Sequence, residues 1–257
     1  MIDQALSPLA DSVTKVAIQL GILDKDGNAF PDPEEITDEY LKNISTKTRA
    51  FLVLCSSELE EYIEARCLEF LSQCVKAIGK TAHHNCLHAL SIHFRNNIGS
   101  LLDGAGYFVD FYASDEQSRR FSKELKGRKN KGDSDPTSDP PVLNKKTLIG
   151  RLCNWYREEV VASNHGIGDQ NLMNLLVPLG FSRNLVKEEC ASLCAALQSL
   201  AAARGEAAHR AAQSSGWPFK GLPTPLEQQL SLRDAWERWN SVLDSLHELE
   251  NLLTIDP

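Results

Sequence analysis

Hydrophobic residues recur at helical spacing along nearly the whole chain. The pattern predicts helices over residues 6–21, 33–43, 45–78, 82–113 (one helix or two), 145–163, 169–178, 183–213 and 226–253. In the long helix, Ser45 is the expected N-cap and Gly79 the expected end. Its apolar stripe is Leu59, Ile63, Cys67, Phe70, Leu71, Cys74, Val75 and Ile78. No convincing strand pattern or internal repeat is present, so the sequence predicts an all-α helical bundle.

One stretch in the middle of the chain breaks the helical pattern. The sequence GDSDPTSDPP is too rich in Pro and Gly for a regular element, so a mobile internal loop is expected at about 127–144. The preceding run over 119–131 holds seven Lys or Arg and one Glu, and it fits either a contact with an anionic partner or a solvated helix end. The expected organisation is an N-terminal helical extension over 1–45 and a helical domain over 46–257 with this loop as an insertion.

Composition narrows the class of protein. The 257 residues carry a formal net charge of −8, so any nucleic-acid contact must use a local basic patch. No run of 18 apolar residues occurs, which argues against a membrane-spanning helix, and the first residues do not resemble a secretory signal. The seven cysteines form no C-x-x-C pair and occupy positions suited to small apolar residues. We therefore expect reduced core thiols in a cytoplasmic protein.

The segment CASLCAALQSLAAARGEAAHRAA, residues 190–212, carries the most informative candidate chemistry. Its predicted buried stripe is Cys190, Leu193, Cys194, Leu197, Leu200 and Ala201. Arg204 lies seven residues after Leu197, about 20° from the same direction around the helix, so the apolar stripe leads into a guanidinium. His209 lies about 140° further around the axis. The surrounding alanines allow another helix to approach closely, which suggests a dimer interface.

RGEAAHR resembles the Arg-x4–6-His signature of the HEPN superfamily of all-α ribonucleases, with Arg204 and His209 as its two residues. The segment over 171–209 resembles the short helix, loop and long helix that carry this signature in HEPN domains. SSELEEYIEARCLEFL resembles the first long helix of the HEPN group found with RiboL-PSP systems. The likeness covers roughly residues 46–253. Gly205 departs from the Asn, Asp or His that usually follows the arginine, and Arg210 replaces a residue that is often small.

The resemblance implies a metal-independent endoribonuclease that acts as a homodimer and uses the 2′-hydroxyl of RNA as the nucleophile. A histidine suits proton transfer near neutral pH, and an arginine suits the phosphate, which gives His209 and Arg204 their expected roles. Arg210 and Lys220 are the expected RNA-binding cations. No cofactor is expected. The family also suggests a role as a toxin or anti-phage defence effector, with a possible inhibitory or regulatory protein partner.

Two other interpretations stay open. The chain also fits a catalytically silent helical module that dimerises or binds a partner protein, which Gly205 and the acidic net charge favour. His84 and His88 are spaced i, i+4 on a predicted helix, a geometry that can bind zinc. They lack the intervening Glu of H-E-x-x-H and any obvious second pair, so a helix start rich in histidine is the simpler interpretation.

Overall fold

The described parts of the chain are almost entirely helical. The computed structural model describes the backbone of residues 2–27, 38–76, 86–93, 108–109, 142–143, 145–214 and 232–254, and the side chains of 6–27, 46–76, 86–93, 149–206 and 233–254. The named elements are α1 (Ile2–Gln19), α2 (Asp38–Lys76), β1 (Phe108–Val109), β2 (Val142–Leu143), α5 (Lys145–Trp155), the π-helix η2 (Tyr156–Val161), α6 (Asp169–Leu176), the 3-10 helix η3 (Val177–Leu179), α7 (Arg183–Glu189), α8 (Ala191–Ser214) and α9 (Leu232–Leu253). A further helix covers 86–93. The prediction of an all-α protein is confirmed.

The chain divides into two units. Unit 1 comprises Met1–Phe70, Asn164–Leu176 and Ser182–Pro257, and unit 2 comprises Leu71–Ser163 and Val177–Phe181. The expected loop over 127–144 lies outside the described residues, except for the two that form β2, and the basic run over 119–131 lies outside them entirely. The predicted division at residue 45 stays a prediction. None of the helices in the described ranges is long and apolar enough to cross a membrane.

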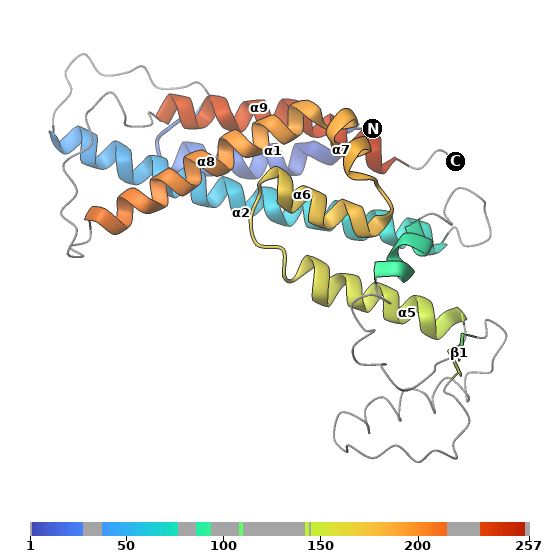
Figure 1. Ribbon diagram of the computed structural model, residues 1–257. Helices are drawn as coiled ribbons and strands as arrows, with labels where there is room; N and C mark the ends of the chain where they lie inside the picture. The colour runs from blue at the N-terminus through green and yellow to red at the C-terminus, as the bar shows by residue number, and fades with distance from the viewer. Residues whose placement is uncertain are drawn as a thin grey trace. The chain divides into compact units, whose positions relative to one another are not determined.

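Unit 1 is built around α1, α2, α8 and α9 (Figure 1). Helix α8 packs along α9, and α1 also packs on α9. Each helix buries one apolar stripe, including Val13 of α1, Leu59 of α2, Leu197 of α8 and Trp239 of α9, all fully buried. On α1, the side chain of Ser12 donates a hydrogen bond of 2.8 Å to Glu58 of α2. The helical periodicity of the sequence therefore becomes a shared hydrophobic core.

Local backbone chemistry sets where α1 and α7 begin or end. Gly21 follows α1 with φ of +67°, the left-handed conformation that glycine adopts without strain. The amide of Ile22 then donates to the carbonyl of Ala17 at 2.8 Å, which satisfies one of the last carbonyls of the helix. At the start of α7, the Ser182 side chain accepts a hydrogen bond of 3.1 Å from the Leu185 amide.

Two predicted helices are divided differently in the structure. Ser45 is not an N-cap, because α2 is continuous from Asp38 to Lys76. This span contains no Gly or Pro, and a serine inside a helix costs only about 0.5 kcal/mol relative to alanine. The predicted helix over 183–213 is instead two helices. Cys190, with φ of −118° and ψ of 37°, separates α7 from α8.

Unit 2 contains α5, which continues directly into the π-helix η2. Its buried apolar residues include Leu152 and Tyr156. β1 and β2 form a parallel pair in which Phe108 faces Val142 and Val109 faces Leu143. The sequence predicted no strands, and it placed Phe108 and Val109 in the helical region over 82–113, which is wrong at these two residues. Two residues per strand are too few for an alternating pattern to be recognised.

Candidate functional site

The helix α8 carries both residues of the predicted signature. Arg204 and His209 lie within its continuous span from Ala191 to Ser214. Five residues at 1.5 Å each separate the two positions by about 7.5 Å along the axis and about 140° around it. The side chains of His209 and Arg210 lie outside the described residues, and so does the whole of Lys220. The structure therefore gives the helical positions of His209 and Arg210, and the side-chain environment of Arg204 alone.

Two contacts from α9 hold α8 in place before it reaches Arg204. A side-chain oxygen of Glu248 accepts a hydrogen bond of 2.9 Å from the Leu193 amide, in the first turn of α8. A carboxylate there satisfies an otherwise free N–H group and lies favourably at the positive end of the helix dipole. Further along, Arg238 donates to the carbonyl of Ser199 at 3.1 Å and also to its hydroxyl. Helix α8 is thus anchored on α9 at two levels.

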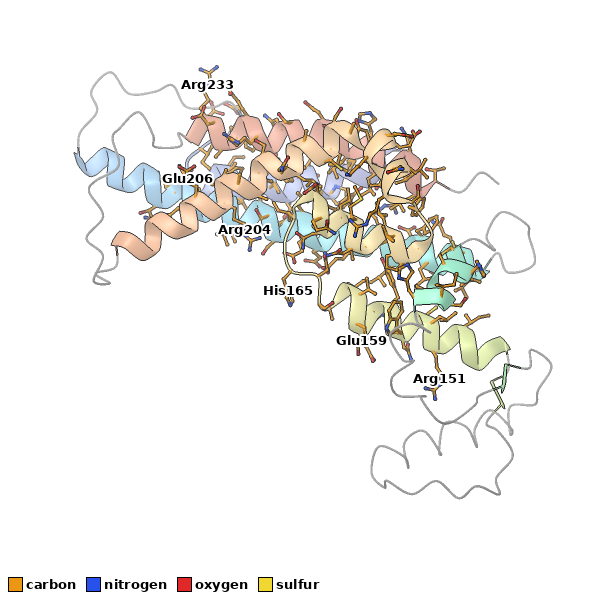
Figure 2. All side chains as sticks on the ribbon, in the orientation of Figure 1. Arg151, Glu159, His165, Arg204, Glu206 and Arg233 are labelled. Atoms are coloured by element: carbon orange, nitrogen blue, oxygen red, sulfur yellow. The ribbon has the colours of Figure 1, made fainter. Side chains whose placement is uncertain are left out.

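The buried stripe of α8 ends at Arg204. Leu193, Leu197 and Leu200 are fully buried, and Ala203 is 3% exposed. Arg204 itself is half-buried, as the predicted continuation of the stripe into a guanidinium required. Figure 2 labels Arg204 and Glu206 on this helix. The arginine thus occupies the edge of the hydrophobic core, where part of its hydration has been removed.

Arg204 lies within electrostatic reach of α2. Burial raises the pKa of the Cys55 thiol to about 12, and the positive charge of Arg204 is among the effects that oppose this rise. Cys55 is fully buried and its thiol donates to the Leu52 carbonyl at 3.6 Å, so it remains a neutral core thiol. This electrostatic effect indicates that Arg204 lies near α2, and the neutral Cys55 gives it no counter-charge.

Among the side chains that the structure describes, none forms a hydrogen bond or an ion pair with Arg204. The described residues leave the surface next to it open. A Cβ atom built at Gly205 meets no described atom within 4 Å, and Ala202 and Glu206 are exposed. A partly dehydrated guanidinium beside open surface can bind an anion, and its planar donors match the oxygens of a phosphate.

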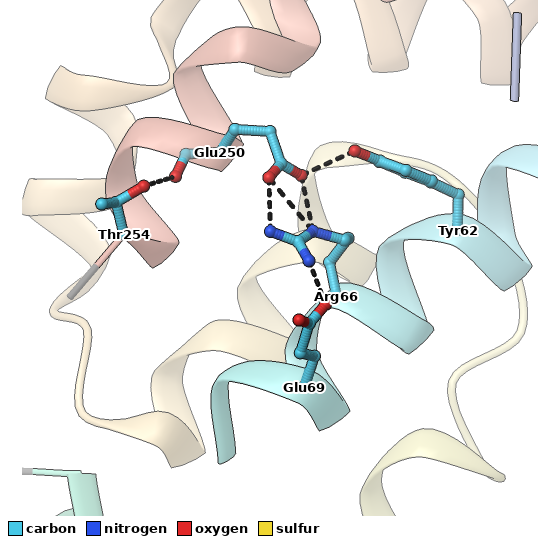
Figure 3. Close-up of polar contacts among 5 residues, drawn as sticks. All are labelled: Tyr62, Arg66, Glu69, Glu250 and Thr254. Carbon is cyan, nitrogen blue, oxygen red and sulfur yellow. Dashed lines mark hydrogen bonds and ion pairs between the residues drawn. The ribbon is translucent and has the colours of Figure 1, made fainter. Parts of the chain in front are cut away.

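A second cluster of polar residues in unit 1 links α2 to α9 (Figure 3). Arg66 binds both oxygens of the Glu250 carboxylate, with distances of 2.8 Å from Nε to Oε1 and 2.5 Å from Nη2 to Oε2. Tyr62 donates to the same carboxylate at 2.6 Å, and Glu69 accepts from Arg66. Burial and the hydrogen bond to Glu250 raise the pKa of Tyr62 above its usual value. Every member of this cluster has a partner, which is typical of a structural link.

The sequence did not predict this cluster. Arg66 and Glu250 are separated by 184 positions, and only the fold brings them together. A signal exists within α2, because Tyr62, Arg66 and Glu69 are spaced i, i+4 and i, i+3 on one face. That spacing predicts interaction between the three, but it cannot identify a carboxylate on another helix.

A third polar group surrounds the loop that precedes α6, also in unit 1. Glu60 of α2 accepts a hydrogen bond of 2.8 Å from the Gly166 amide, where φ is +124°. Burial, followed by the charge of Glu60, raises the pKa of the neighbouring Glu64, and His165 opposes the rise. His165 is exposed (Figure 2). The group fastens the loop to α2, and sequence spacing gave no indication of it.

The described residues offer no group of three or more His, Cys, Asp or Glu side chains that could hold a metal ion. Of the histidine pair that the sequence suggested as a zinc site, His88 is exposed and His84 lies outside the described residues.

Comparison of the chain with protein-family models, curated proteins and solved structures finds no match.

Proposed function

We propose that this protein is a metal-independent endoribonuclease of the HEPN type, in which Arg204 binds the scissile phosphate and His209 transfers the proton. The observation that carries the proposal is the half-buried guanidinium of Arg204, which has no described partner and lies beside open surface on the helix that also carries His209. A charge left in this state favours an anionic ligand, because the ligand replaces the hydration that folding removed.

The proposed reaction is a transfer of the phosphoryl group within the RNA strand. A base takes the proton from a 2′-hydroxyl, whose oxygen attacks the adjacent phosphorus, and the 5′-oxygen of the next nucleotide leaves and takes up a proton from an acid. His209 suits one of these transfers, since an imidazole titrates near neutral pH. Arg204 balances the charge that develops on the phosphate oxygens. The products carry a 2′,3′-cyclic phosphate and a 5′-hydroxyl.

One chain supplies a single Arg204–His209 pair, and a homodimer that joins two copies across one cleft would supply both an acid and a base. We place the dimer interface on the alanine-rich α8, with Arg210 and Lys220 as RNA-backbone contacts. A specific interface of this kind buries on the order of 1,000 Å² or more. A role as a toxin or defence effector, held off by a partner protein, follows from the family resemblance. Light scattering at micromolar concentration that finds a monomer would contradict the dimer.

The decisive experiment is incubation of the purified protein with mixed RNA in EDTA. Cleavage should persist, and Arg204→Ala and His209→Ala should each lower its rate by about 100-fold or more. Arg183→Ala is a matched control, because it also removes one positive charge from unit 1, at an exposed position on α7. It should leave the rate nearly unchanged. Activity that EDTA abolishes and zinc restores, products with 5′-phosphate ends, or an active His209→Ala protein would each contradict the proposal.

A silent dimerisation or partner-binding module is the second candidate function. Val53 and Leu54, neighbours on α2, are 47% and 44% exposed. They directly precede Cys55, the residue that feels the charge of Arg204, and apolar groups exposed together favour a protein interface. If RNA cleavage is absent, Leu54→Glu should dissociate the dimer. Leu185→Glu, at a residue 38% exposed on α7, is the matched control and should not.

A further inference from the structure

One contact joins α9 to the part of α8 that leads to Arg204. Arg238 of α9 donates a hydrogen bond of 3.1 Å from Nη1 to the Ser199 carbonyl, and the same nitrogen donates to the Ser199 hydroxyl. Arg238 is half-buried, and none of the described carboxylates forms an ion pair with it. The hydrogen bonds of Arg238 to described residues therefore all go to one residue of α8.

The acceptor lies one helical turn before Arg204. Helix α8 is continuous to Ser214, so the carbonyl of Ser199 also accepts the amide of Ala203, the residue next to Arg204. This carbonyl is not one of the unpaired groups at the end of a helix, and the contact does not cap α8. Its effect is instead to fix the turn over 199–203 against α9.

The same turn of α9 also holds α2. The rings of Trp236 and of Phe51 in α2 contact each other, with centroids 5.8 Å apart and an angle of 48° between their planes. Phe51 is fully buried and lies one turn before Cys55, the residue of α2 that feels the charge of Arg204. Trp236 and Arg238, two positions apart, thus hold both helices near Arg204.

We infer that Arg238 is a positioning residue, which sets the place of Arg204 through the Ser199 turn of α8. The contact is independent of the proposed ribonuclease activity, but its consequence for catalysis rests on that proposed function. A guanidinium that balances charge on a phosphate must meet the phosphate oxygens closely, and a misplacement of about 1 Å can lower a rate by about 100-fold. Arg238 acts on the reaction only through Arg204.

Hydrogen exchange tests the positioning without RNA. Arg238→Met keeps an apolar stem and deletes both hydrogen bonds. The amides of residues 200–206 should then exchange about 10-fold faster, as expected when a hydrogen bond from a charged group is lost. Arg238→Lys retains a cationic donor and should restore part of the protection. Arg233→Met is the matched control, because this arginine of α9 has a side chain that is 70% exposed, and it should leave residues 200–206 unchanged.

Two results of this measurement would overturn the inference. One is exchange over 200–206 that Arg238→Met does not change. The other is an equal increase along α1, which would show a loss of overall stability and no specific effect on α8. Ser199→Ala deletes the hydroxyl and leaves the carbonyl, so it should keep most of the protection. Exchange as fast as in Arg238→Met would contradict the assignment to the main chain of α8.

The rate of RNA cleavage tests the consequence for function. Arg238→Met should lower the rate by about 10-fold in the parent, and by less than about 2-fold where Arg204 is already replaced by alanine, because the two residues act in series. The same loss in both backgrounds would overturn the inference, since a general structural defect does not depend on Arg204.

The two measurements distinguish failure of the inference from failure of the proposed function. If the parent protein does not cleave RNA, the proposed ribonuclease activity is wrong, and hydrogen exchange still decides whether Arg238 holds the turn before Arg204. If the parent cleaves RNA and Arg238→Met matches it in both exchange and rate, the positioning role is wrong and the proposed function stands.

Discussion

Arg66 on α2 and Arg204 on α8 both lie at the edge of the core of unit 1, and their surroundings are opposite. The Arg66 side chain is 22% exposed, and it binds the carboxylates of Glu250 and Glu69. Arg204 is also partly buried, yet no described side chain pairs with it. The two side chains share residue type and approximate burial and differ in their partners.

This difference separates a structural arginine from a binding one. Glu250 is only 4% exposed, so removing either member of the pair would leave an uncompensated charge near the core. Arg66 gains nothing from a further anion, because two carboxylates already occupy its donors. No described side chain uses the donors of Arg204, which makes it the more suitable site for a phosphate. Stability should therefore depend on Arg66, and ligand binding on Arg204.

The largest expected effect is that of Glu250→Ala. This change leaves Arg66 without its buried carboxylate and Tyr62 without an acceptor, and should lower the free energy of unfolding by about 3 kcal/mol. Glu69→Ala is the matched control. It removes the second carboxylate that binds Arg66. The Glu69 side chain is 53% exposed, so its loss should lower the free energy of unfolding by about 0.5 kcal/mol or less. Urea denaturation measures the free energy of unfolding of both variants, and equal losses would show that burial does not determine the strength of this cluster.

Tyr62→Phe should lower the free energy of unfolding by about 1 kcal/mol, because it deletes one hydrogen bond to a carboxylate and keeps the ring. This loss of stability should depend on pH. The native pKa of Tyr62 is raised, so its contribution is fully present below the unfolded value near 10 and is lost as the pH rises above that value toward the native one. Denaturation at pH 8 and above pH 10 should therefore show the difference between the two proteins shrinking. A difference that grows with pH would contradict the assignment.

Much of unit 1 could be predicted from the sequence because its information is local. The stripe Leu193, Leu197 and Leu200 fixes which side of α8 is buried, and the same periodicity leads to a half-buried Arg204. The ends of helices were harder to predict from the sequence. Ser45 suits both an N-cap and a helix interior, and the break at Cys190 has no Gly or Pro to mark it.

The remaining site features depend on contacts between distant parts of the chain. Glu250 and Arg66 are 184 positions apart, and nothing near Glu250 in the sequence distinguishes it from the other carboxylates of α9. Periodicity predicts which face of a helix is buried, but it does not say which helix will cover that face.

Gly205→Ala tests whether the surface beside Arg204 is open. A glycine inside a helix costs roughly 0.5–1 kcal/mol relative to alanine, and the space around Gly205 is open. The variant should therefore raise the free energy of unfolding by about that amount, measured by urea denaturation. Gly150→Ala, in α5 with equally open surroundings, is a matched control that should gain a similar amount. If Gly205→Ala alone destabilises the protein, the surface beside Arg204 is occupied and is not open to a ligand.

The smallest expected effect on stability is that of Arg204→Gln, within about 0.5 kcal/mol of the parent. Glutamine keeps part of the aliphatic stem, the change deletes no described hydrogen bond, and it removes a charge that folding has partly dehydrated. The same variant should weaken RNA binding, and the slope of binding against salt concentration should become shallower, since one phosphate contact is lost. Arg66→Gln should do the reverse, with a large loss of stability and no direct effect on RNA binding. A loss of 2 kcal/mol or more for Arg204→Gln would place Arg204 with Arg66 as a structural residue, and the proposed phosphate site would then lose its basis.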